Sequence, residues 1–336
     1  MPGYAPTGSG NVHYDQFLTN ISVAWPNMEL VGNQLFPQVT VRKQSDKYYV
    51  FNGREAWVPE ASDVRAPGSE AHEIPGMKVS LDTYYAQEHS LQIAVTDEER
   101  ENTDSPMSPD RDATELVTSK VLLAREIVMR DMVTATANYA TGLSVTLQLA
   151  ADTVSDGVTY GRQWSEANST PIRDIRRAKA KMHAKSWIQP NVAVIPYQVM
   201  TALEDSADLI DRIKYSERAL LTPELIATML GLGKVIVPGG GYSNTNIGQA
   251  VVPGYIWGKD VLLAYVPDRP GLRTPAFGYE FVWGYGGGLA QAVDRWREER
   301  RKSDVLRLSR RYDLKLIGVD SSGDTLAGFL FKNAVA

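Results

Sequence analysis

The stretch that decides the fold lies at 38–95 and opens with QVTVRKQSDKYYVF, residues 38–51, in which apolar side chains recur at strand spacing. The chain returns with MKVSLDTYYAQEHSLQIAV, residues 77–95, in which Val79, Leu81 and Tyr85 fall on alternate positions. Alternation of this kind predicts β-strands with one apolar face. We therefore expect two strands that run out and back as a long hairpin.

The connection between these strands, 52–76, holds three prolines, three glycines and seven charged residues. A connection of about 25 residues without structure of its own is uncommon in a compact domain and usually indicates function. Its few apolar side chains cannot form a core alone, so we expect an arm that contacts another chain. The candidate inter-subunit contacts of this region and of the N-terminal segment are Trp25, Phe36, Arg42, Lys43, Lys47, Arg54, Trp57, Arg65, Glu70 and Ile74.

Outside this hairpin, residues 1–13 indicate an extended arm, and a short helix is expected at 14–25. The strongest helix signal is at 112–138, where Asp112 and Glu115 have capping-box spacing. Its apolar stripe is expected to comprise Val117, Val121, Ala124, Val128, Met132 and Ala135. A second helix is predicted at 171–185, because Thr170 and Pro171 are favoured at a helix start.

The remaining chain alternates strands and helices from Asn191 onward, which predicts a separate α/β unit in the middle of the sequence. Strands are expected at 192–195, 234–237, 256–265 and 277–283, and helices at 197–211 and 222–230. A returning strand at 305–316 alternates Leu306, Leu308, Tyr312, Leu314 and Leu316 with polar residues, and a last strand is expected at 325–331.

Composition excludes several classes of protein. The chain of 336 residues has no cysteine, which rules out disulfides and thiolate metal sites. It has no signal peptide and no apolar run long enough to span a membrane. With 35 basic against 40 acidic side chains, the formal charge of −5 does not suit a protein that wraps nucleic acid through its phosphates.

No catalytic, cofactor or metal site is predicted. The four histidines, at 13, 72, 89 and 183, lack metal-ligand spacing, and the glycine runs at 239–241 and 286–288 match neither a P-loop nor a dinucleotide fingerprint. The acidic run at 97–104 is expected to be a helix start rather than a cation site. Two basic faces remain, with Arg173, Arg176 and Arg177 on one and Arg307, Arg311 and Lys315 on the other. They could contact nucleic-acid phosphates or pair with carboxylates, and the acidic balance favours pairing.

Several fragments, in order, resemble the major capsid proteins of tailed bacteriophages, in particular the lambda-like major head protein family. They are LFPQVTV at 35–41, KQSDKY at 43–48, TDEE at 96–99, PNVAVI at 190–195, IKYS at 213–216, TPE at 222–224, IWGK at 256–259, LLAY at 262–265 and PAFGY at 275–279. The resemblance covers the chain from about residue 30 to its end.

This resemblance implies an α+β chain with the Hong Kong 97 fold. Its parts would be an N-terminal arm at 1–41, an extended β-hairpin loop at 42–92, a peripheral domain at 93–189 and 285–336, and an axial domain at 190–284. The protein would then be no enzyme but a structural shell subunit, arranged as pentamers and hexamers around double-stranded DNA in a virion assembled in the host cytoplasm. It would have no cofactor and no membrane partner.

Portal and decoration proteins are further expected partners, and a separate scaffolding protein is expected because the arm begins near Met1. Some members of the family cross-link lysine to asparagine, and Lys43, Lys47 and Lys78 lie in or near the loop, but no catalytic acid is identifiable. Two alternatives stay open: an encapsulin-like compartment shell of the same fold, and a hydrolase or nucleotide-binding enzyme that uses the middle α/β unit.

Overall fold

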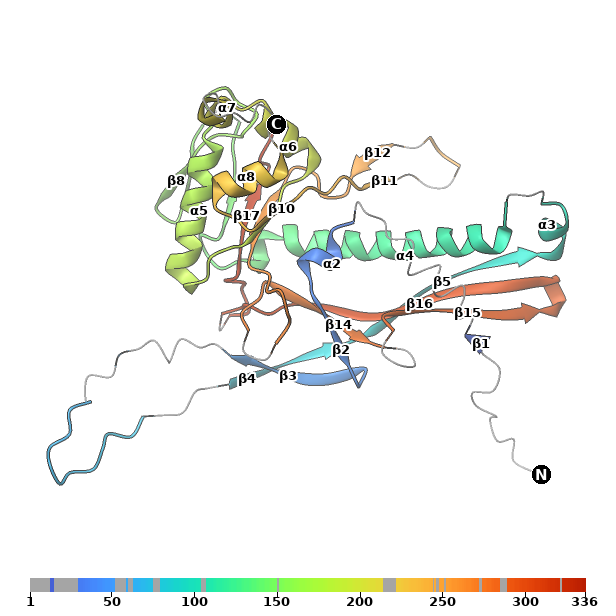
Figure 1. Ribbon diagram of the computed structural model, residues 1–336, viewed down its shortest axis with the longest axis horizontal. Coiled ribbons are helices and arrows are strands. Elements are labelled where there is room, and N and C mark those ends of the chain that lie inside the picture. Colours follow the sequence, from blue (N-terminus) through green and yellow to red (C-terminus); the bar gives the residue numbers. More distant parts are fainter. Residues whose placement is uncertain are drawn as a thin grey trace.

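The computed structural model describes residues 13–14, 30–51, 59, 63–74, 79–103, 107–149, 151–213, 222–243, 245, 248–250, 252–271, 274–284, 289–320 and 322–336. The described chain has an elongated half, a compact unit at one end, and two ribbons that project from them (Figure 1). The predicted helix at 14–25 lies outside the described residues apart from Tyr14, which is in a strand.

The elongated half is a six-stranded sheet built around one long strand, β16. The order along its main path is β1 (His13–Tyr14), β15 (Gln291–Glu298), β16 (Ser303–Leu316), β14 (Gly278–Trp283) and β2 (Gln38–Val41). The strand β5 (Gln87–Thr96) pairs antiparallel with β16 over Ser303–Tyr312. A 3-10 turn, η3 (Glu299–Arg301), joins β15 to β16, and the predicted strands at 277–283 and 305–316 are both confirmed.

Helix α4 (Pro109–Thr134) lies along this sheet as the predicted long helix (Figure 1). It begins at Pro109 rather than Asp112, and it ends before a separate 3-10 turn, η2 (Thr136–Asn138). The predicted apolar stripe is right at Val117 and Val121 and in part at Met132, which packs against the core. It is wrong at Ala124, which is exposed, and at Val128, which is 48% exposed. The buried positions continue instead through Arg125, Met129 and Val133. Because a helix has 3.6 residues per turn, buried positions spaced by four residues shift gradually around it. This shift fits the contacts of α4, which packs first on the elongated sheet and then on the compact unit.

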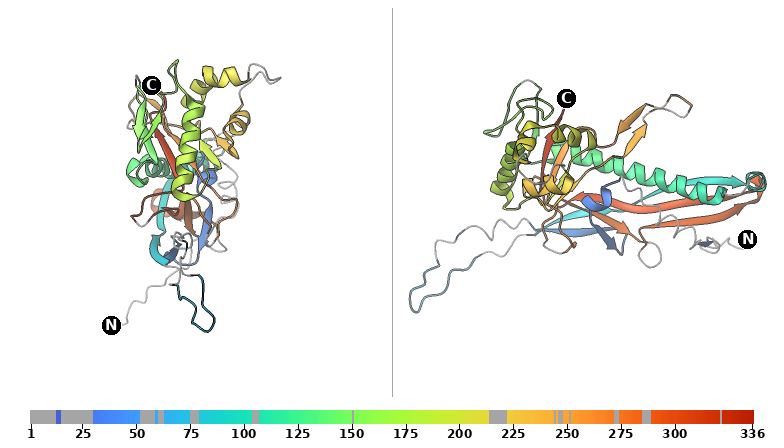
Figure 2. Two further views of the ribbon diagram at one scale, coloured as in Figure 1. Left: turned by 90° about the vertical axis from the view of Figure 1, so that its left-hand side faces the viewer. Right: turned by 45° about the horizontal axis from the view of Figure 1, so that its top comes forward.

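The compact unit is a five-stranded sheet with helices around it (Figure 2). Its strand order is β10 (Lys234–Ile236), β9 (Val192–Val194), β13 (Val261–Ala264), β17 (Gly328–Lys332) and β6 (Ser144–Thr146). The helices are α5 (Pro171–Ser186), α6 (Tyr197–Glu204), α7 (Ala207–Ile213) and α8 (Pro223–Leu230), and a small hairpin pairs β7 (Thr153–Ser155) with β8 (Val158–Tyr160). The predicted helix at 197–211 is thus two helices.

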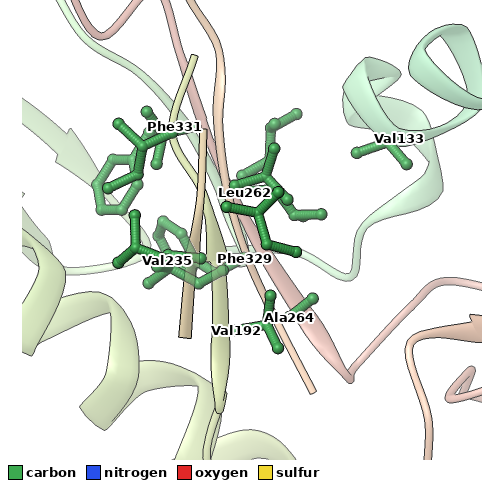
Figure 3. Close-up of a cluster of buried hydrophobic side chains, with 14 of the residues drawn as sticks. Val133, Val192, Val235, Leu262, Ala264, Phe329 and Phe331 are labelled. Carbon is green, nitrogen blue, oxygen red and sulfur yellow. The ribbon is translucent and has the colours of Figure 1, made fainter. Parts of the chain in front are cut away.

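The core of this unit is formed by segments far apart in the sequence. Figure 3 shows Val133 of α4 in one cluster with Val192, Val235, Leu262, Ala264, Phe329 and Phe331. The sequence indicated a separate unit in the middle of the chain, but the block 190–284 is not closed on itself. Strands β6 and β17 of its sheet come from outside the block, and β14 pairs in the elongated sheet instead. The buried strand β13 needs a partner on both sides, and β17 supplies the second.

Two ribbons project from the body. The first pairs β3 (Ser45–Phe51) with β4 (Val79–Tyr85), as predicted, and the described residues 63–74 beyond it lie far from the rest of the chain and are exposed (Figures 1 and 2). The second pairs β11 (Gly241–Ser243) with β12 (Pro253–Tyr255), and it begins at the last residue of the glycine run at 239–241. The short helices α2 (Gly32–Leu35) and α3 (Asp97–Glu101) complete the described elements. Helix α3 has a capping box between Thr96 and Glu99, so the acidic run is indeed a helix start.

Candidate assembly surfaces

The ribbon β3–β4 is held to the body by one of its two faces. Tyr48 and Tyr84 both lie against Phe281 of β14, with ring centroids 5.1 and 4.9 Å away. The Tyr48 hydroxyl donates to an Asp82 carboxylate oxygen at 2.5 Å. Burial of Tyr48, together with its bond to Asp82, raises the pKa of that phenol far above its usual range. The root of the ribbon is therefore fixed in place.

The opposite face of the ribbon carries apolar side chains that are more than half exposed. Tyr49, Leu81 and Tyr85 are 59%, 55% and 57% exposed. The register places Tyr49 opposite Leu81 and Ser45 opposite Tyr85, so all of these residues share one face. We call Tyr49, Leu81 and Tyr85 the outer ribbon face. Grouped exposed apolar residues of this kind are typical of protein–protein contacts.

The candidate contact residues fall into three groups. Arg42, Lys43, Lys47, Arg65, Glu70 and Ile74 are exposed on the ribbon or the loop, and Lys43 pairs with Asp46 at 3.1 Å. Trp25, Arg54 and Trp57, like Lys78, lie outside the described residues. Phe36 was wrong as a contact with another subunit: its side chain is fully buried and lies edge-on to Phe277, 5.8 Å away. A large aromatic residue in an irregular segment must be buried somewhere, and here the chain's own core buries it.

The basic residues of β16 pair within the chain. Arg307 bonds Asp294 at 2.6 Å and lies over the ring of Trp296. Arg311 bonds Glu88 at 2.9 Å, and Lys315 is 3.9 Å from Asp313. Each of the three basic side chains predicted on this face thus has a carboxylate partner within the chain.

The basic side chains of helix α5 differ in whether they have partners within the chain or are exposed. Lys181 and Lys185 pair with Asp156 at 2.7 and 3.1 Å, and Arg177 donates to the carbonyl oxygen of Thr159. The side chains of Arg173 and Arg176 are exposed. Of the basic face predicted on α5, Arg173 and Arg176 are therefore exposed, whereas Arg177 is bonded within the chain.

Sequence reasoning missed a buried charge cluster between α4 and the elongated sheet. The Glu280 carboxylate of β14 accepts from Arg125 at 2.9 and 2.5 Å and from Arg310 at 2.8 Å. All three side chains are at most 3% exposed. Burial opposes ionisation of Glu280, but the two guanidinium groups outweigh it and hold the pKa of Glu280 below its usual value. The sequence held one indication of this cluster. In the two-residue alternation of β16, Arg310 falls on the same face as the buried residues Leu308 and Tyr312.

The next residue of α4, Glu126, binds the backbone at the start of helix α2. Its carboxylate accepts from the backbone N–H of Val31 at 3.0 Å and of Gly32 at 3.0 Å. It also accepts from the indole N–H of Trp257 at 2.8 Å. The side chain is fully buried, and three donors satisfy it in the way that a buried carboxylate requires. Sequence reasoning did not identify this site either.

Nothing among the described residues resembles a catalytic centre. No group of three or more histidine, aspartate or glutamate side chains is placed there to hold a metal ion. None of the helices in the described part of the chain combines the length and the apolar character needed to cross a membrane. The buried carboxylates of Glu126 and Glu280 accept from backbone N–H groups, an indole N–H and guanidinium groups of the chain itself.

Comparisons with known proteins agree with this picture. No protein-family model matches the chain. The chain is 27% identical over 320 residues to the major capsid protein of Burkholderia phage BcepMu, covering 91% of this chain and 94% of that protein.

Among solved structures, a phage-related protein from Bordetella bronchiseptica RB50 superposes with a TM-score of 0.71 at 22% identity, over 97% of this chain and 98% of the other. The mature capsid of bacteriophage PhiM1 gives a TM-score of 0.54 at 13% identity, over 99% and 91%. The fold is that of phage capsid proteins of the Hong Kong 97 type.

Proposed function

We propose that this chain, which its relatives identify as a phage major capsid protein, assembles as pentamers and hexamers into an icosahedral head around double-stranded DNA. As a structural shell protein it is not an enzyme. The single observation in this structure that carries the finer proposal is the outer ribbon face, which is apolar, exposed and held out on a fixed root.

A second copy of the chain is the partner that this face fits. Burying a large apolar side chain stabilises by about 1.5–3 kcal/mol, so completing the burial of three half-exposed ones contributes about 3 kcal/mol per copy. A two-stranded ribbon is also marginally stable alone and gains from packing on a neighbour. Because every copy in a closed shell makes the same contact, these modest contributions add up and stabilise the whole assembly.

The shape of the subunit favours rings. The ribbon β3–β4 leaves the body at one end, whereas β11–β12 projects from the compact unit in a different direction (Figure 1). A protrusion that docks on a different part of the next copy makes a heterologous contact, which closes into a ring when the rotation allows it. The compact unit then serves as the axial domain at the ring centre, and the elongated half as the peripheral domain. The segment 42–92 serves as the extended loop.

The packaged DNA would be held without sequence-specific contacts. The formal charge of −5 and the internal pairing of Arg307 and Arg311 leave little basic surface for phosphates. A separate scaffolding protein, a portal and decoration proteins complete the proposed set of partners. Assembly takes place in the host cytoplasm.

The experiment compares Leu81→Ser with Leu149→Ser. Both leucines are about half exposed, at 55% and 51%, but Leu149 lies in the compact unit, away from the ribbon. Each purified variant is brought to assembly conditions with its scaffolding partner, and particles are counted by negative-stain microscopy and sedimentation. We expect Leu81→Ser to keep the circular dichroism and melting temperature of the unchanged chain but to form few particles, whereas Leu149→Ser assembles normally. Equal assembly of both variants would contradict the proposed contact, and a chain that never assembles would contradict the function.

A further inference from the structure

Helix α4 joins two separate apolar cores. The smaller one contains Val117 and Val121 together with side chains of β5, β15 and β16. The larger one contains Met129 and Val133 together with the compact unit and the near end of the elongated sheet. Between these two sets, the buried side chains of α4 are the charged Arg125 and Glu126. These two charges therefore lie between the apolar positions of α4, beside a larger core that itself extends from the compact unit onto the elongated sheet.

Each of these charged residues bonds a different part of the molecule. Arg125 bonds Glu280 of the elongated sheet. Glu126 bonds Trp257, which lies just before β13 of the compact unit, and one turn later Arg130 donates to the carbonyl oxygen of Ile256 at 3.1 Å. Apolar contacts are non-directional and tolerate small rotations. Hydrogen bonds to a buried charge are short and directional, so they define an orientation.

We infer that Glu126, through Trp257, fixes the angle between the compact unit and the elongated half and thereby sets the curvature of the assembled shell. The inference rests on the proposed function, because only an assembled shell has a curvature. If the compact units meet at the ring centre and the elongated halves at its rim, the angle between them determines how strongly neighbouring rings tilt. Glu126 is a positioning residue, and Val31 and Gly32 tie the arm-proximal segment to the same carboxylate.

Two conservative variants separate the bonds. Trp257→Phe keeps an aromatic ring in the compact unit and removes the N–H that reaches Glu126. Glu126→Gln keeps one acceptor oxygen but places an NH₂ group where Glu126 Oε2 accepts the N–H of Gly32. The matched control is Tyr160→Phe, which removes a buried hydroxyl of the compact unit that has no partner among the described atoms. Glu126→Gln and Tyr160→Phe each change one polar group, whereas Trp257→Phe also removes part of a buried ring from the apolar core.

The readouts are the diameter distribution of assembled particles by electron cryomicroscopy and the hydrogen exchange of unassembled subunits. We expect Trp257→Phe to shift or broaden the diameter distribution, while Tyr160→Phe gives the same diameters as the unchanged chain. In Glu126→Gln subunits, exchange of the Gly32 amide should accelerate about tenfold, as expected for loss of a bond to a charged group.

Particles of Trp257→Phe with the same diameters as the unchanged chain would overturn the inference, whatever happens to Glu126→Gln. If Glu126→Gln does not fold, the Trp257→Phe comparison decides alone. If the unchanged chain makes no particles, the proposed function fails instead, and the two failures are therefore distinct.

Discussion

Removing the acid of the buried charge cluster should cost far more than removing one of its bases. In Glu280→Gln, Arg125 and Arg310 keep their charges, because guanidinium groups do not deprotonate in proteins, but lose the carboxylate that both contact within 2.9 Å. Breaking a buried pair by removing one partner costs about 3–5 kcal/mol. This is a large share of the about 5–15 kcal/mol by which a folded protein is stable.

Arg310→Met is the informative comparison. It leaves Arg125 bonded to both oxygens of Glu280 as a neutral pair, and methionine fills much of the vacated space. We expect it to cost only about 0–2 kcal/mol, because one charge is lost while the remaining two stay paired. Glu115→Gln is the surface control: its partner Arg111 is 60% exposed, and such pairs contribute about 0–1 kcal/mol.

The assay is urea unfolding of unassembled subunits, followed by tryptophan fluorescence and circular dichroism and analysed by linear extrapolation. The expected order of destabilisation is Glu280→Gln, then Arg310→Met, then Glu115→Gln. A cost of Glu280→Gln below about 1 kcal/mol, or a larger cost for Arg310→Met than for Glu280→Gln, would refute the assignment of Glu280 as the acid shared by two buried bases.

Two further predictions concern the segment beside α4 and the far end of the sheet. Gly32→Ala should destabilise by about 1–3 kcal/mol in urea unfolding, because the added Cβ would lie 2.8 Å from Glu126 Oε2 and 2.9 Å from Met129 Cε. Gly239→Ala, which meets no atom within 4 Å, should be nearly neutral, and equal effects would count against the close approach. Burial opposes ionisation of Asp304, but its bonds with Arg295 and Arg100 outweigh burial and lower its pKa. Its stabilisation is therefore present above the unfolded pKa of about 3.9 and is lost as the pH falls through the lower folded value. The stability difference between the unchanged chain and Asp304→Asn should shrink on acidification from pH 7 to about pH 3; a constant difference would argue against this linkage.

Local sequence patterns were sufficient to predict those helices and strands that keep one face against the same surface along their whole length. The alternation in β16 and the Pro171 start of α5 were predicted correctly because one face of each element meets one surface. The ribbon β3–β4 was also found, but its apolar alternation identified an exposed face at Leu81 and Tyr85 rather than a buried one. Period two in a sequence shows that two faces differ, not which of them the chain itself covers.

The burial of Arg125 and Glu126 could not be predicted from the sequence, for a physical reason. A charged residue in a helix is normally at the surface, so Arg125 and Glu126 interrupted the expected apolar stripe and moved it to Val128. Their partners lie far away in sequence, 155 residues for Arg125 with Glu280 and 131 for Glu126 with Trp257. Only the folded arrangement shows that these charges are paired, and pairing is what makes their burial tolerable.

The position of β17 in the five-stranded sheet bears on how the chain is made. This strand sits between β13 and β6, yet it lies at 328–332 of 336 residues. During translation the sheet therefore lacks this inner strand until residues 328–332 have been made. Pairings between distant segments also form slowly. A nascent chain that has not reached this strand consequently has no finished compact unit to offer to a neighbour.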